Sequence, residues 1–210
     1  MKKLFAIVAL VAAMFVAGNV QAQTTVNIGY SPETFKTAYN SNSTKINYQG
    51  LHFGFISNVK LVREFGIGAG AQIRMNMKQN KESLLGSTVT TKDFQLLIDV
   101  PVLLNININI NNNFAITPFV GPMASFAAVG KTNTKVMAGN SQISNTDESW
   151  YGEDSGFKRF NLYAVFGGNV RFGGFNLYGG YRMGLLNLLK DSGDVTMKTN
   201  GFFVGLGFTL

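Results

Sequence analysis

The sequence of 210 residues has no cysteine, a single histidine and only four prolines. Without cysteine the chain forms no disulfide bond and offers no thiolate ligand to a metal, so its stability has to come from its hydrogen-bond ladder. Beyond the N-terminal segment, no stretch keeps a 3.6-residue apolar period and no second long apolar run follows. These absences argue against helices and against a helical membrane span.

The N-terminal segment has the composition of a secretory signal peptide. Lys2 and Lys3 form a positive start, residues 4–17 are apolar, and residues 20–22 supply small or modest side chains at the cleavage positions. The apolar run is shorter than the roughly 20 residues that a spanning helix needs. We therefore predict that residues 1–22 are a signal peptide and that residues 23–210 form the mature, single-domain protein.

The chain is basic, with 18 Lys and Arg residues against 11 Asp and Glu residues and a formal net charge of +7. A basic exported protein can meet lipid headgroups or the phosphates of lipopolysaccharide. The simpler interpretation, which we favour, is that loop lysines keep the loops soluble. Nucleic acid is not an expected partner outside the cytoplasm.

The mature chain consists of segments in which apolar residues alternate with polar or small ones, the period of a β-strand. Gly173–Gly174 is a hairpin signal between two of these segments. Pro118 and Pro122 fall on the apolar face of another, where the missing backbone donors predict a bulge or irregularity. The alternation predicts eight strands, at about residues 24–30, 46–58, 64–77, 91–106, 114–130, 157–172, 175–186 and 201–210.

The connections between these strands alternate between long and short. The four long ones are polar and cover residues 31–45, 78–90, 131–156 and 187–196. Outer-membrane barrels have this rhythm, because their periplasmic turns are short and their extracellular loops are longer. We therefore predict an all-β fold, an eight-stranded antiparallel up-and-down transmembrane β-barrel in the outer membrane.

Charged residues support the same fold. If the lipid-facing side of each strand is chosen from its apolar residues alone, all the strand charges considered fall on the opposite side. A soluble barrel of the lipocalin type would be apolar inside and polar outside, which is the inverse pattern. Buried charges must be paired, so we expect a plugged lumen rather than an open pore. The predicted lumen network comprises Glu64, Gln72, Arg74, Asp99, Arg171 and Arg182.

The last ten residues form the predicted closing strand. Its small residues face the lumen, and it should pair with the first strand near residues 26–30 so that no open edge remains. We expect barrel-assembly machinery to insert the chain and outer-membrane lipid and lipopolysaccharide to surround it. The lipid-facing residues of this strand are Phe202, Val204, Leu206, Phe208 and Leu210.

Four short motifs resemble the PorT-like outer-membrane β-barrel family of Bacteroidetes-type Gram-negative bacteria. They are the acidic, apolar and proline-containing strand at residues 93–104, Gly-Pro at residues 119–123, the Tyr-Gly-Gly-Tyr-Arg strand at residues 177–185, and the closing strand at residues 204–208. Members of that family usually end on an aromatic residue, whereas this chain ends Phe208-Thr209-Leu210. The resemblance implies location and fold, and it supplies no activity.

Three functional hypotheses remain open from the sequence. The preferred one is a non-enzymatic protein whose loops, chiefly residues 31–45 and 131–156, contact the envelope or an unidentified protein partner. The second is a lipid A-modifying enzyme that uses His52 with Ser57 and Asp99, although their strand positions make a triad weak. The third is a narrow channel. The acidic residues around Trp150 and Tyr151 match no calcium loop, so we expect no metal and no cofactor.

Overall fold

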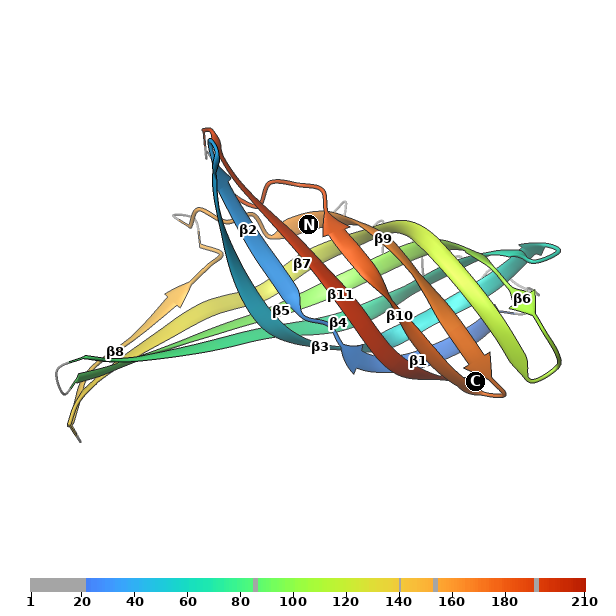
Figure 1. The fold of residues 1–210 in the computed structure, drawn as a ribbon, viewed down its shortest axis with the longest axis horizontal. Helices are drawn as coiled ribbons and strands as arrows, with labels where there is room; N and C mark the ends of the chain where they lie inside the picture. Colours follow the sequence, from blue (N-terminus) through green and yellow to red (C-terminus); the bar gives the residue numbers. More distant parts are fainter. Residues whose placement is uncertain (1–21, 85–86, 140, 153–154, 191–192) are drawn as a thin grey trace.

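The computed structural model describes residues 22–84, 87–139, 141–152, 155–190 and 193–210. The predicted signal peptide, residues 1–22, lies outside this part of the chain except for Ala22. In the described residues no helix is long and apolar enough to cross a membrane. The strands form one antiparallel sheet (Figure 1): β1 (Ala22–Tyr30), β2 (Glu33–Tyr39), β3 (Asn42–Val62), β4 (Phe65–Leu84), β5 (Ser87–Ile106), β6 (Ile108–Asn109), β7 (Phe114–Ala138), β8 (Ser141–Ser149), β9 (Phe160–Phe172), β10 (Phe175–Gly184) and β11 (Val195–Thr209).

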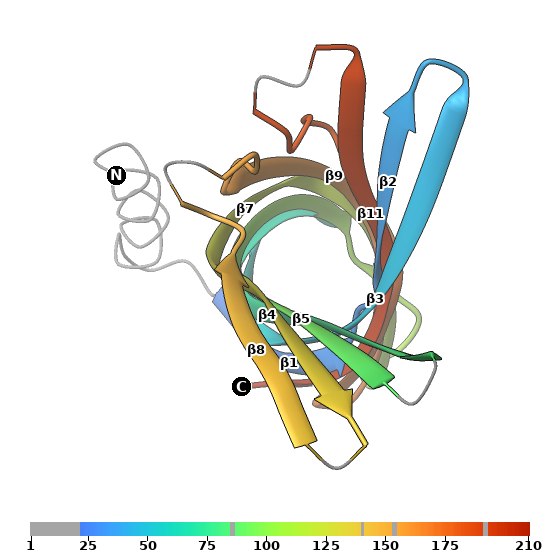
Figure 2. The same ribbon diagram turned by 90° about the vertical axis from the view of Figure 1, so that its left-hand side faces the viewer.

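The sheet closes into a barrel, as the alternation predicts. β1 pairs with β11 on one side, with Val26 opposite Phe208 and Tyr30 opposite Val204, and with β3 on the other. Seen along its axis, the wall surrounds the interior completely (Figure 2). The predicted closure between the first and the last strand is thus confirmed.

The first strand is longer than predicted, because β1 and β2 act as one. β2 also pairs with both β11 and β3, and the register runs through Ser31–Pro32 without a shift. Pro32 has no N–H to give to the ladder, which accounts for the local break. Counted this way, the ring contains eight strands: β1 with β2, then β3, β4, β5, β7, β9, β10 and β11.

The barrel is apolar outside and polar inside. All five predicted lipid-facing residues of the closing strand lie on the outside, and Leu206 is 63% exposed. Water-soluble monomers rarely expose a continuous apolar surface of this kind. It is continued around the wall by Ile28, Leu51, Phe53, Phe55, Phe65, Ile73, Ile98, Leu104, Val120, Phe166, Phe175 and Leu177.

At one end of the barrel, strands continue where long loops were predicted (Figure 1). Residues 31–45 contain β2 and the start of β3, with a tight turn at Asn40. Residues 78–90 and 131–156 contribute the ends of β4, β5 and β7 and the whole of β8. These three loop predictions are wrong, because backbone pairing continues through polar residues that carry no apolar alternation. By the rule that extracellular connections are the longer ones, this is the outer end.

The opposite end has short connections, as predicted. Gly173–Gly174 joins β9 to β10, and Gly173 adopts a φ of 58°, a conformation that glycine tolerates without strain. Arg63 and Glu64 form the turn between β3 and β4. The C-terminus lies at this end as well (Figure 1), which is then the periplasmic one.

The predicted irregularity near the prolines is confirmed. In the β5–β7 ladder, Pro101 pairs with Met123 and Leu104 pairs with Val120, but the two positions between these pairs are unpaired. This gap contains Pro122, which has no N–H to donate. A separate register shift lies between Leu96 and Leu97. The extra residue in β7 exchanges its two faces. Beyond the shift, the outward side chains of β7 are therefore the odd-numbered ones, such as Lys131 opposite Phe94.

Candidate functional site

An ion-pair cluster closes the barrel interior. Arg74 on β4 donates from Nε to Asp99 Oδ2 on β5 at 2.7 Å and from Nη2 to Asp99 Oδ1 at 3.2 Å. Its Nη1 donates to Glu33 on β2. All three side chains are fully buried. Residues from three strands thus meet inside the barrel.

Polar neighbours complete the hydrogen bonding of both carboxylates. Ser125 Oγ donates to Asp99 Oδ1 at 2.5 Å. Tyr163 OH donates to Glu33 Oε1 at 2.5 Å, and Asn76 Nδ2 donates to Glu33 Oε2 at the same distance. Every carboxylate oxygen of the cluster therefore has a donor, which is what a buried charge requires.

Arg182 on β10 is the fourth buried charge of this region. It is 3% exposed, donates from Nη2 to Ser31 O at 3.1 Å, and has no hydrogen-bond partner at Nε in the described structure. Its guanidinium lies over the Phe203 ring, 5.6 Å from the centroid. With Arg74, Glu33 and Asp99 it forms a group whose formal charges cancel.

An aromatic cap covers the outer side of the charged group. Phe35 and Tyr48 pack on Leu188, and the Trp150 ring centroid lies 6.4 Å from that of Phe35 and 6.0 Å from that of Tyr48. Trp150 Nε1 donates to Thr132 Oγ1 at 2.8 Å. The segment after β8 therefore folds back over the mouth instead of extending into solvent.

Tyr151 continues the cap inward. Its hydroxyl accepts a hydrogen bond from Gln95 Nε2 at 2.5 Å, and the Arg159 guanidinium lies 5.1 Å from its ring centroid. Burial raises the pKa of the Tyr151 phenol, so the group stays neutral at ordinary pH. Trp150 and Tyr151 therefore both pack against the barrel, whereas in a simple surface loop they would have been available to a ligand.

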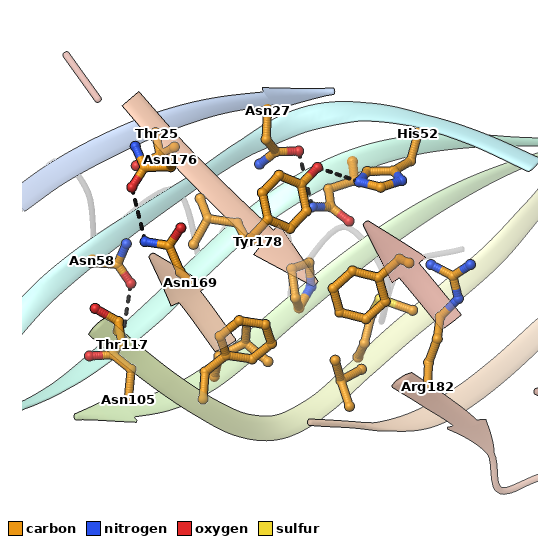
Figure 3. Close-up of a pocket in the computed structure, with 18 residues that line it drawn as sticks. Thr25, Asn27, His52, Asn58, Asn105, Thr117, Asn169, Asn176, Tyr178 and Arg182 are labelled. Atoms are coloured by element: carbon orange, nitrogen blue, oxygen red, sulfur yellow. Dashed lines mark hydrogen bonds between the residues drawn. The ribbon is translucent and has the colours of Figure 1, made fainter. Parts of the chain in front are cut away.

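Below the charged group is a cavity of about 90 Å³ (Figure 3). His52, Tyr178 and Arg182 lie on its polar side, and Phe203, Phe119 and Leu103 form apolar wall. Toward the periplasmic end it adjoins a polar vestibule of about 250 Å³. The vestibule is rich in asparagine, contributed by Asn58, Asn107, Asn109, Asn169 and Asn176.

The predicted lumen residues divide into two groups. Arg74, Asp99 and Arg182 meet in the buried cluster, and Gln72 donates to Asn27 inside the barrel at 3.3 Å. Arg171 lies apart, half-buried at the vestibule, where it donates to Gln23 and Asn109. Glu64 is exposed in the β3–β4 turn and takes no part in the ion pairs that Arg74 makes with Glu33 and Asp99.

Sequence reasoning missed Glu33, the carboxylate that takes the place expected for Glu64. Glu33 lies in residues 31–45, and the polar composition of this stretch predicts a loop. A usable signal was present in Thr34, Phe35, Thr37 and Tyr39, since β-branched and aromatic residues favour strands.

The structure does not assemble the triad considered for catalysis. His52 Nε2 is 2.5 Å from Tyr178 OH. Ser57 Oγ is instead hydrogen-bonded to Thr24 Oγ1 at 2.7 Å, and Asp99 is bonded to Arg74 and Ser125. No Ser–His–carboxylate chain therefore connects these groups.

The acidic segment offers no metal site in the part of the chain that the structure describes. Asp147 and Glu148 lie on the exposed strand β8, and no group of three His, Asp or Glu residues there could hold an ion. Glu153 and Asp154 lie outside the described residues.

Replacement of Trp150 tests whether the cap is closed in solution. In Trp150→Ala, loss of the ring contacts and the Thr132 hydrogen bond should destabilise the segment by about 1.5 kcal/mol or more. Trypsin cleavage after Lys158 and Arg159 in the folded barrel should then be about tenfold faster. Ile143→Ala, at an exposed position of β8, is the control and should leave cleavage unchanged. Equal rates for both variants would contradict a closed cap.

A family model and several solved structures are similar to this chain. A family model described as "Outer membrane protein beta-barrel domain" matches residues 15–190. No curated protein matches the chain. Among solved structures, the attachment invasion locus protein Ail of Yersinia pestis is 13% identical, with a TM-score of 0.44, and the alignment covers 90% of this chain and 99% of Ail. The outer membrane protease OmpT of Escherichia coli is 10% identical, with a TM-score of 0.43 and coverage of 92% and 99%.

Proposed function

The chain belongs to the outer membrane protein β-barrel domain family and is thus an outer-membrane protein. We propose that it is a sealed, non-enzymatic scaffold that presents β-hairpins to a protein partner outside the cell. The observation that carries the proposal is the closed interior. Arg74, Glu33 and Asp99 block the lumen at one level, above the cavity and the vestibule, while the outer strands continue past them. Function then belongs to the extensions rather than to the interior.

The interior supports neither alternative as well as it supports a scaffold. A channel needs a continuous polar path, whereas the charged cluster and the Trp150 cap block the outer half of this lumen. A lipid-modifying enzyme needs its nucleophile beside its base, whereas Ser57 and His52 have separate partners.

The β7–β8 hairpin is the best candidate surface for the partner. β8 pairs only with β7 in the described structure, so its other edge is free to accept a strand from another protein. The β-branched Ile143 on β8 is 64% exposed. We further propose that the barrel belongs to the PorT-like branch of the family, whose members include proteins tied to secretion; the motifs at residues 93–104 and 177–185 support this.

A site-specific crosslink tests the proposal. The chain has no cysteine, so Ile143→Cys creates a single site for a thiol-linked photo-crosslinker in cells that make the protein. We expect irradiation to yield one discrete higher-mass adduct that contains this chain and a second protein. Arg63→Cys, exposed in the turn at the opposite end, is the matched control and should not give that adduct.

Two results would overturn the scaffold hypothesis. One is the absence of a protein adduct from Ile143→Cys in folded barrels. The other is a reproducible single-channel conductance of the wild-type protein in planar bilayers, which would favour the channel.

A further inference from the structure

Three lysines stand side by side across three strands at the outer end. In the sheet register, Lys198 on β11 is directly opposite Lys36 on β2, and Lys36 is directly opposite Lys45 on β3. Adjacent strands are about 4.8 Å apart, so three ammonium groups originate within roughly 10 Å. We call these residues the lysine row.

No member of the lysine row forms an ion pair with another described residue. All three side chains are exposed, and within the described part of the chain none of them takes part in a side-chain hydrogen bond. Like charges directly opposite each other on a sheet repel and weaken the pairing. An anion bound between the three ammonium groups would be attracted to each of them and would offset this repulsion.

The row lies on the outward face of the barrel, in line with the membrane-facing side chains. Lys198 shares its parity with Phe202 and Val204, whereas Phe35, next to Lys36, points inward to the aromatic cap. Tyr30 and Phe202 pack edge to face, with ring centroids 6.2 Å apart, and aromatic rings of this kind mark the level of the lipid headgroups.

The height of the row fits the phosphate layer. Lys198 and Phe202 are four positions apart, which is about 13 Å along the strand. Strand tilt reduces this to about 10 Å along the membrane normal, and long lysine stems can bend back toward the interface. On the outward face, the next residues from the lysine row toward the membrane are polar: Asn200, Thr34 and Asn47.

We propose that the lysine row binds the phosphate groups of a phosphorylated lipid in the outer leaflet. Two observations select this occupant: three uncompensated positive charges, and the continuity of their face with the lipid-facing wall. The site goes beyond the scaffold role, since it serves the barrel's attachment to its own membrane and leaves the β7–β8 hairpin free.

Native mass spectrometry of the folded chain, titrated with bisphosphorylated lipid A, tests the site. We expect Lys36→Gln/Lys45→Gln/Lys198→Gln to weaken lipid A binding at least tenfold. The matched control with the same charge change is Lys60→Gln/Lys92→Gln/Lys135→Gln, at the periplasmic end of β3 and on β5 and β7, which should stay within twofold of wild type. Equal weakening in both triple variants would reduce the effect to net charge and overturn the proposal.

Two further measurements test whether misfolding of the triple variant or binding of free phosphate explains the result. If the triple variant folds poorly, the single variant Lys36→Glu replaces it. This variant places a negative charge between two lysines, so it should fold normally and still lose lipid A binding. Unchanged lipid A binding by Lys36→Glu would refute the site. Inorganic phosphate at the same phosphate concentration should not displace lipid A. Displacement would identify a site for free phosphate instead of lipid.

Discussion

Arg74→Met should be the most damaging single substitution in the barrel interior. Removal of the guanidinium leaves Glu33 and Asp99 as buried carboxylates without an ion-pair partner. Breaking one buried pair costs about 3–5 kcal/mol, and two are broken here. We expect the variant to lose most of its folded population, measured as the heat-modifiable band on SDS gels and as a lower midpoint of urea unfolding.

A charge-balanced variant separates electrostatics from packing. Arg74→Met/Asp99→Asn leaves Glu33 and Arg182 as the remaining buried charges, which cancel, so it should recover much of the lost stability. Arg171→Met is the matched control, because Arg171 is half-buried at the vestibule and hydrogen-bonds only to neutral side chains. A folded yield of Arg74→Met equal to that of the control would show that the cluster does not hold the barrel together.

Gly205→Val should break the closure of the barrel. A Cβ at Gly205 would lie 2.5 Å from the backbone oxygen of Ile28 on β1 and would collide with the Tyr178 hydroxyl. Overpacking in a well-packed interior costs about 1–3 kcal/mol, and contact with backbone leaves less room to relax. We expect at least that loss in urea unfolding, with more protein failing to reach the folded band.

The same substitution at Gly168 on β9 is the control. Nothing lies within 4 Å of a Cβ built there, so Gly168→Val should fold like the wild type. Similar behaviour of the two variants would mean that strands β1 and β11 are not held in the register described.

The sequence predicted the barrel wall well because strand geometry is local. A side chain's face follows from its parity alone, so Phe202 and Leu206 were assigned outward and Arg74 and Asp99 inward without knowledge of the neighbours. The Gly173–Gly174 turn was equally local. Polar strands were missed, because their pairing depends on partners distant in the sequence.

The candidate site was predictable only in part. Arg74 and Asp99 were identified, since an inward charge in a narrow lumen requires a partner. Glu33 was not, because its place in the lumen depends on β2 continuing the register of β1 past Pro32. The closing of the mouth by Trp150 depends on contacts with Phe35, Tyr48 and Thr132 from three other strands.

By itself, then, the sequence determined the strand period, the outward and inward faces and the membrane setting, all of which follow from residues two apart in one strand. Only the tertiary structure decided which charges meet and which lysines align. A contact between side chains on different strands is set by register, and register depends on the closure of the whole ring. The Glu33–Arg74 pair and the lysine row exist because β2 is a strand between β3 and β11.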